Sequence, residues 1–77
     1  MTATISLKLF ATLAKRTPED SSRFPIAPGS TVREVVARLN ISEEEAKLIF
    51  INNKRALLTS VLNDGDRVGI FPPVGGG

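Results

Sequence analysis

The C-terminal carboxylate of Gly77 is the group in this sequence best suited to covalent chemistry. The chain has no Cys and no His, so it lacks the thiolate and the imidazole on which many nucleophilic and general-base sites depend. Glycine has no Cβ, so a glycine thread can pass through a narrow channel and deliver an unhindered acyl group. Because a free carboxylate is a poor acyl donor, we expect a partner enzyme to activate it. The tail residues that we expect to thread into this partner are Pro72, Pro73, Val74, Gly75 and Gly76.

Chain length limits what else the protein can do. We expect 77 residues to form one domain, 1–77, in which 72–77 are a flexible tail. A core this small supplies about 3–5 kcal/mol, which leaves little margin for a strained, desolvated site. Without Cys there is neither a disulfide nor a Cys-based zinc site. We therefore predict a binding or carrier module without catalytic residues, metal site or bound cofactor, and not an enzyme.

The charged residues indicate a solvated surface. Ten Lys and Arg against eight Asp and Glu give a net charge of +2, and the basic residues are scattered, whereas nucleic-acid binders gather them beside stacking aromatics. The longest apolar run, Leu48 to Ile51, is too short to span a bilayer. The N-terminus lacks the basic and apolar regions of a signal peptide. We expect a cytoplasmic protein that binds neither nucleic acid nor membranes.

Two strongly apolar strands are predicted near the ends of the sequence. Residues 4–10 alternate polar and apolar side chains, as a half-buried strand does. Residues 67–71 form the last strand, which Pro72-Pro73 must end because proline cannot donate to a ladder. We expect these two strands to be the central pair of a sheet. A short strand over 23–26 follows the first as a hairpin, and Pro25 confines it to an edge.

The middle of the sequence predicts one main helix. Thr31 and Glu34 form a capping box, and Val32, Val35, Val36 and Leu39 then recur on one helical face. Asn40 is a plausible stop in the left-handed region. Residues 42–45 repeat the capping pattern and predict a short second helical segment. A strand over 48–51, a turn at Asn52-Asn53 and a return strand over 55–58 follow.

These elements predict an α+β fold, with a mixed sheet of four to five strands and the helix on one face. If Val68 and Ile70 face the helix, alternation places Gly69 and Phe71 on the opposite face, together with Phe10. An uncovered sheet face with two aromatic side chains is an apolar patch of the kind that marks binding sites. We expect Phe10, Gly69 and Phe71 to form a partner-binding face, unless a loop covers them.

The stretch from Leu62 to Gly77 resembles the C-terminal motif of the β-grasp sulfur carriers. It combines an Asp-Gly-Asp turn (64–66), Phe-Pro-Pro (71–73) and terminal glycines. This family includes the small subunit of molybdopterin synthase and the sulfur carrier of thiamine biosynthesis. The predicted element order is similar to the ubiquitin-like β-grasp over essentially the whole chain. Phe71-Pro72-Pro73 looks more like the molybdopterin branch, since the thiamine branch is usually shorter and lacks Phe-Pro-Pro.

The resemblance implies a mechanism carried out by partners. A ubiquitin-activating-type adenylyltransferase would use ATP to convert the Gly77 carboxylate into an acyl adenylate. A sulfur donor, such as a sulfurtransferase or a cysteine desulfurase, would then displace AMP and leave a thiocarboxylate. An acceptor enzyme such as the large subunit of molybdopterin synthase would take the sulfur for molybdenum or tungsten cofactor synthesis.

Three other functions remain open on the sequence alone. The sulfur can go to the thiazole of thiamine. The chain can be a ubiquitin-like modifier, whose activated Gly77 is joined to lysines of other proteins. It can also be a plain interaction domain with an incidental glycine tail. The fate of the carboxylate separates them, because sulfur transfer releases the carrier, conjugation leaves an isopeptide, and an interaction domain is not activated.

Overall fold

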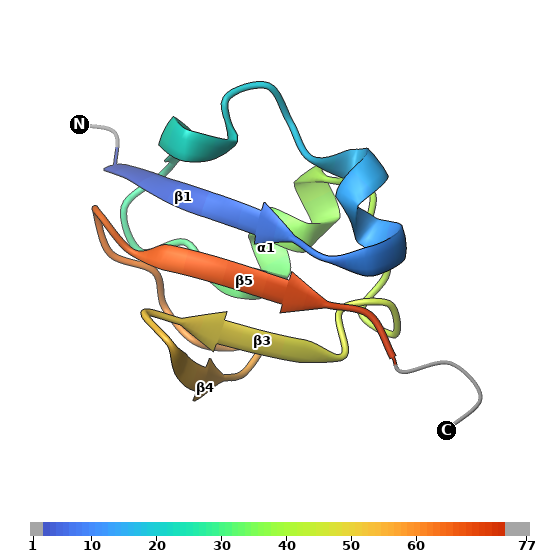
Figure 1. Ribbon diagram of the computed structural model, residues 1–77. Coiled ribbons are helices and arrows are strands. Elements are labelled where there is room, and N and C mark those ends of the chain that lie inside the picture. Colours follow the sequence, from blue (N-terminus) through green and yellow to red (C-terminus); the bar gives the residue numbers. More distant parts are fainter. Residues whose placement is uncertain (1–2, 74–77) are drawn as a thin grey trace.

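A single mixed sheet organises the computed structural model, which describes residues 3–73 (Figure 1). Its five strands are β1 (Ala3–Leu9), β2 (Phe24–Ile26), β3 (Leu48–Ile51), β4 (Lys54–Ala56) and β5 (Arg67–Phe71). Their order across the sheet is β2-β1-β5-β3-β4. β1 and β5 pair in parallel, and the other neighbours are antiparallel. The prediction that the first and last strands are neighbours inside the sheet is confirmed, and Pro25 lies on an edge strand.

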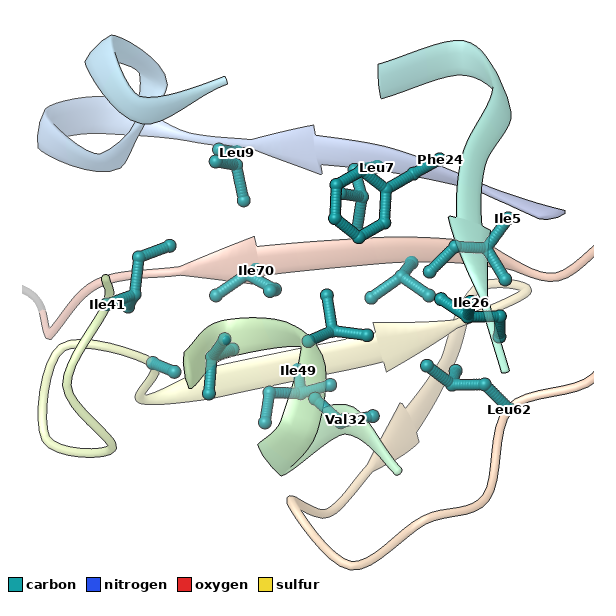
Figure 2. Close-up of a cluster of buried hydrophobic side chains, with 14 of the residues drawn as sticks. Ile5, Leu7, Leu9, Phe24, Ile26, Val32, Ile41, Ile49, Leu62 and Ile70 are labelled. Atoms are coloured by element: carbon teal, nitrogen blue, oxygen red, sulfur yellow. The ribbon is translucent and has the colours of Figure 1, made fainter. Parts of the chain in front are cut away.

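One face of the sheet is covered by helix α1 (Val32–Arg38), which lies behind the sheet in Figure 1. Figure 2 shows the side chains packed between them. Alternate residues of β1 and β5 face this core, and so do three valines of α1: the set is Ile5, Leu7, Leu9, Val32, Val35, Val36, Val68 and Ile70. Burial of these apolar side chains is the main stabilising contribution.

The start and end of α1 follow the local sequence. Glu34 N donates to Thr31 Oγ1 at 3.4 Å, and Thr31 N donates to Glu34 Oε2 at 3.3 Å, so the predicted capping box is present. Asn40, just beyond the helix, has a φ of 60°, the left-handed conformation that asparagine tolerates. Two short 3₁₀ helices, η1 (Ala11–Arg16) and η2 (Ser21–Arg23), lie between β1 and β2.

Two predictions were wrong, one about a helical segment and one about the end of a strand. Residues 42–45 form a single hydrogen-bonded turn and not a second helical segment. Ser42 and Glu45 do make both capping contacts, but Ala46 is buried and the amide of Lys47 donates to the Phe71 carbonyl, so the chain is already extended. The return strand ends at Ala56, before Leu58, because the amide of Leu57 donates to the Ser60 hydroxyl in a turn.

The start of β5 is held by turns on both sides. Thr4 N donates to Asp64 Oδ1, and Gly65 N donates to the Thr4 carbonyl, each at 2.8 Å. On the other side, Arg67 N donates to Asn52 Oδ1 at 3.0 Å. These bonds set the register of β5 against both neighbours, so they also set where Phe71 lies at the other end of the strand.

None of the helices in residues 3–73 has the length and apolar character that crossing a membrane requires.

Candidate partner-binding site at the end of β5

Three phenylalanine rings meet on the sheet face opposite α1. The rings of Phe10 and Phe71 are parallel within 1°, with centroids 4.1 Å apart. Phe50 meets Phe71 edge-on, with centroids 5.7 Å apart and an interplanar angle of 79°. All three side chains are partly buried. Both stacked and edge-to-face pairs are favourable ring geometries, so these residues, which we call the aromatic patch, form one ordered apolar surface.

Gly69 forms the floor beside the aromatic patch. A Cβ at this position would meet a ring carbon of Phe10 at 3.5 Å and one of Phe71 at 4.0 Å. The missing side chain helps to leave a shallow, open hollow of about 780 Å³. The hollow is lined by strand residues of β1, β3 and β5 and by hydroxyl side chains of the segment 17–22. An open hollow with an apolar aromatic wall suits contact with another molecule.

The end of β5 is held on both sides close to the aromatic patch. Phe10 N donates to the Ile70 carbonyl at 3.2 Å, and Lys47 N donates to the Phe71 carbonyl at 3.0 Å. Pro72 then has no amide hydrogen to continue the ladder. The chain therefore leaves the sheet at a defined point next to the patch, and this point is where the tail begins.

The structure brings together three of the predicted site residues. Phe10, Gly69 and Phe71 share the face opposite the helix, as the alternation predicted, and no other element of residues 3–73 lies over it in Figure 1. Pro72 is partly buried and Pro73 is exposed. The other predicted tail residues, Val74, Gly75, Gly76 and Gly77, lie outside the described residues.

Sequence reasoning missed Phe50 and the cations around the patch. Phe50 pairs with Gly69 across the sheet, while its neighbour Ile49 is buried in the core. A signal was present, because Leu48 to Ile51 is apolar on both faces and therefore needs cover on both. Lys8 and Arg67 line the hollow, although their separation in the sequence concealed their common location.

The sequence matches the model of one known protein family. The model of the ThiS family matches residues 7–77. The chain belongs to the ThiS family. The family assignment agrees with the resemblance to β-grasp sulfur carriers, and it spans both the aromatic patch and the glycine tail of the sequence.

Solved structures place this ThiS-family chain in the ubiquitin-like β-grasp fold. It is similar to the solution structure of the Haloferax volcanii HVO 2177 protein, with a TM-score of 0.78 and 27% identity over 99% of this chain and 88% of that one. SAMP1 from Haloferax volcanii matches with a TM-score of 0.67 and 24% identity, covering 97% of this chain and 100% of that one. A putative molybdopterin converting factor, subunit 1, from Pyrococcus furiosus matches with a TM-score of 0.62 and 23% identity, covering 94% and 99%. No curated protein matches the sequence.

Proposed function

We propose that this ThiS-family protein carries sulfur as a thiocarboxylate on Gly77 and donates it in the synthesis of molybdopterin, the organic part of the molybdenum and tungsten cofactors. The observation that carries the proposal is the aromatic patch at the end of β5. A carrier without its own catalytic residues must bind its partners beside its reactive end. The stacked pair of Phe10 and Phe71 lies at the point where the tail leaves the sheet.

The residues around the tail also support the molybdopterin branch. Phe71-Pro72-Pro73 is the segment most similar to that branch, and in the fold it supplies both the patch and the start of the tail. The putative molybdopterin converting factor subunit from Pyrococcus furiosus shares the fold over nearly its whole length. Proline restricts the backbone to extended conformations, so Pro72 and Pro73 favour an extended start to the tail.

The chemistry proceeds in three steps on the partner enzymes. In the first, a carboxylate oxygen of Gly77 attacks the α-phosphate of ATP, giving an acyl adenylate and releasing pyrophosphate. In the second, the terminal sulfur of a persulfide on the sulfur donor attacks the acyl carbon and AMP leaves with its electron pair. A thiol then cleaves the acyl disulfide, which releases the thiocarboxylate and forms a new disulfide with the thiol. The product is a thiocarboxylate, whose sulfur is a better nucleophile than the carboxylate oxygen. This chain contributes recognition and the acyl group, while the adenylyltransferase binds ATP.

Intact-mass spectrometry tests this proposal. The chain is incubated with ATP, a sulfur source and the ubiquitin-activating-type adenylyltransferase of the same genome. We expect one oxygen of the C-terminal fragment to be replaced by sulfur, and no change in a control chain that lacks Gly76 and Gly77. The product is then offered to a molybdopterin-synthase large subunit and, in parallel, to a thiazole synthase. Sulfur transfer to the second alone would assign the protein to thiamine synthesis.

A second candidate is protein modification. It is favoured by the similarity to small archaeal modifier protein 1 from Haloferax volcanii, with a TM-score of 0.70 and 23% identity over 94% of this chain and 99% of that one. Activation is the same in both cases, so only the acceptor differs. Peptide mass spectrometry of cell proteins would show lysines that carry the terminal glycines if the chain is conjugated. Absence of both activation and conjugation would leave a plain interaction domain.

A further inference from the structure

Cationic side chains flank the aromatic patch at both ends of one row, on the sheet face opposite α1. Strand register pairs Lys8 of β1 with Gly69 of β5, Gly69 with Phe50 of β3, and Phe50 with Arg55 of β4. Residues paired in this way point to the same face. Lys8 and Arg55 therefore bracket the row, three strand spacings or about 14 Å apart. Arg67 lies next along β5 on the same face, beside Ser6.

This face is basic, although Asp64 lies at one end of it, where the Thr4 hydroxyl donates to its carboxylate at 3.4 Å, and Arg55 also borders a second hollow that Glu43 and Glu44 line. The strand residues on it are Thr4, Ser6, Lys8, Pro25, Leu48, Phe50, Arg55, Arg67, Gly69 and Phe71, and none is Asp or Glu. No residue lining the hollow beside the aromatic patch is acidic. Within residues 3–73, the ion pairs join Arg16 to Glu45 and Arg33 to Glu43, so the three cations of this face have no anionic partner there.

Three occupants can be compared by their chemistry. A second copy of the chain, docked face to face, would bring six cations together around one apolar contact, which like-charge repulsion disfavours. Single-stranded nucleic acid uses free aromatic faces for base stacking, but Phe10 and Phe71 each use one face for the other at 4.1 Å. A protein with an apolar socket and an acidic rim matches both the rings and the cations.

We infer that the partner that receives the tail binds this face through an apolar socket for the aromatic patch, with acidic side chains around the socket that meet Lys8, Arg55 and Arg67. The inference rests on the proposed function, because it assigns the socket to the adenylyltransferase that activates Gly77. Charges at the rim of an interface mainly raise the association rate and select the partner. The cations therefore make the encounter depend on ionic strength, whereas the rings hold the complex.

Salt-dependent binding tests the inference. Isothermal titration calorimetry measures the Kd of the chain for the adenylyltransferase of the same genome at several NaCl concentrations. Lys8→Glu and Arg67→Glu are compared with Lys15→Glu, which makes the same charge change on η1 at a residue that does not line the hollow. Melting curves show whether each variant is folded. If a charge-reversal variant does not fold, Lys8→Gln or Arg67→Gln takes its place.

We expect each reversal on the face to raise Kd about tenfold at low salt and to flatten its dependence on NaCl. Equal Kd values and salt slopes for Lys8→Glu, Arg67→Glu and Lys15→Glu would overturn the inference. So would binding of a single-stranded RNA probe that needs Lys8 and Arg67 when the enzyme does not bind.

Adenylation is measured separately, as ATP-dependent pyrophosphate release over a range of carrier concentrations that includes saturation. Normal pyrophosphate release with an unchanged KM for the carrier in the Lys8 and Arg67 charge reversals would overturn the inference that acidic residues of the partner meet these cations. It would not contradict the proposed carrier function. Salt-dependent binding of the wild-type chain without pyrophosphate release from ATP would instead contradict the proposed function. It would still support the inference that the partner has acidic residues around the socket. The two failures are therefore distinguishable.

Discussion

Phe10 and Phe71 stack with their ring centroids 4.1 Å apart, although 60 residues separate them in the sequence. The stack exists because β1 and β5 are parallel neighbours, with Leu9 paired to Ile70. Parallel pairing brings the C-terminal ends of both strands to the same edge of the sheet. Phe10 therefore lies beside the residue from which the tail leaves, where we expect the proposed partner to bind.

Phe71→Ala should separate binding from folding. A ring that acts as a binding hot spot contributes about 2 kcal/mol to partner affinity, so we expect Kd for the adenylyltransferase to rise about thirtyfold. Loss of the ring pair should cost the fold only about 0.5–1.5 kcal/mol, because Phe71 is partly exposed. Calorimetric binding and a melting curve measure the two effects.

Phe24→Ala is the matched control for the Phe71 variant. Phe24 is 5% exposed and belongs to the core, so its removal should cost about 3–5 kcal/mol. This is comparable to the whole stability expected of so small a chain. If Phe71→Ala destabilises the protein as much as Phe24→Ala and leaves the Kd of the folded fraction unchanged, the patch is structural.

The length of the tail should matter for activation and not for stability. Deleting Gly76 and Gly77, or adding one residue after Gly77, leaves the described core of residues 3–70 intact, so the melting temperature should stay within about a degree. Adenylation should be abolished, because one residue moves the carboxylate by about 3.5 Å, which is as large as the separation of two reacting atoms. Pyrophosphate release measures activation. Full activity of the extended chain, without trimming, would show that Gly77 is not the reactive end.

Substitutions at Gly69 should affect the hollow more than the fold. In Gly69→Ala the new methyl meets the rings of Phe10 and Phe71 at 3.5 and 4.0 Å, which are ordinary contacts. Alanine in a strand is better than glycine by about 0.5–1 kcal/mol, so the free energy of unfolding should rise slightly. Gly69→Met places a long side chain on the floor of the hollow and should weaken partner binding by at least about 1.4 kcal/mol, or tenfold. Unchanged binding of the folded Met variant would show that the hollow is not part of the interface.

The stability of the protein should fall in acid partly through Glu45. The Arg16 guanidinium donates to both carboxylate oxygens at 3.0 Å and, with the backbone amide of Ser42, holds the pKa of Glu45 below its ordinary value of 4.5. A lowered pKa in the folded state means that the contribution is present above about pH 4.5 and is lost as the pH falls through the folded value.

Melting curves between about pH 3 and pH 7 check this dependence. The melting temperature of Glu45→Gln should lie below that of the wild type at neutral pH, and the difference should shrink in acid. The effect should be small because the pair is exposed. Glu44→Gln, at an exposed neighbouring position, is the control. A wild-type advantage over Glu45→Gln that persists unchanged at low pH would contradict the assignment.

The two asparagines of the β3–β4 turn should respond differently to substitution. Both have positive φ, 53° at Asn52 and 68° at Asn53. Only Asn52 also bonds across to β5, accepting from Arg67 N and donating to Asp66, each at 3.0 Å. Asn52→Ala should cost about 1–3 kcal/mol, whereas Asn53→Gly should be neutral or slightly stabilising. Urea unfolding compares them, and equal losses would show that the side-chain bonds to β5 contribute nothing.

Local patterns in the sequence determined the elements and their faces. Alternation over residues 4–10 and 67–71 separated core residues from Phe10, Gly69 and Phe71, because successive side chains of a strand point to opposite sides. The capping box at Thr31 and the stop at Asn40 are also local, since they depend on hydrogen bonds and backbone conformation within a few residues. The same local logic failed at residues 42–45, because the capping contacts of a helix also fit a single turn.

Only the tertiary structure decided what lies beside the patch. The neighbours of β5 depend on pairing between segments far apart in the chain, which no local pattern records. The antiparallel pairing of β3 with β5 brings Phe50 to Phe71. The pairings of β1 and β4 place Lys8 and Arg55 at the two ends of one row. Cations that are scattered along the sequence therefore surround one apolar surface, because strand register converts separation along the chain into neighbourhood across the sheet.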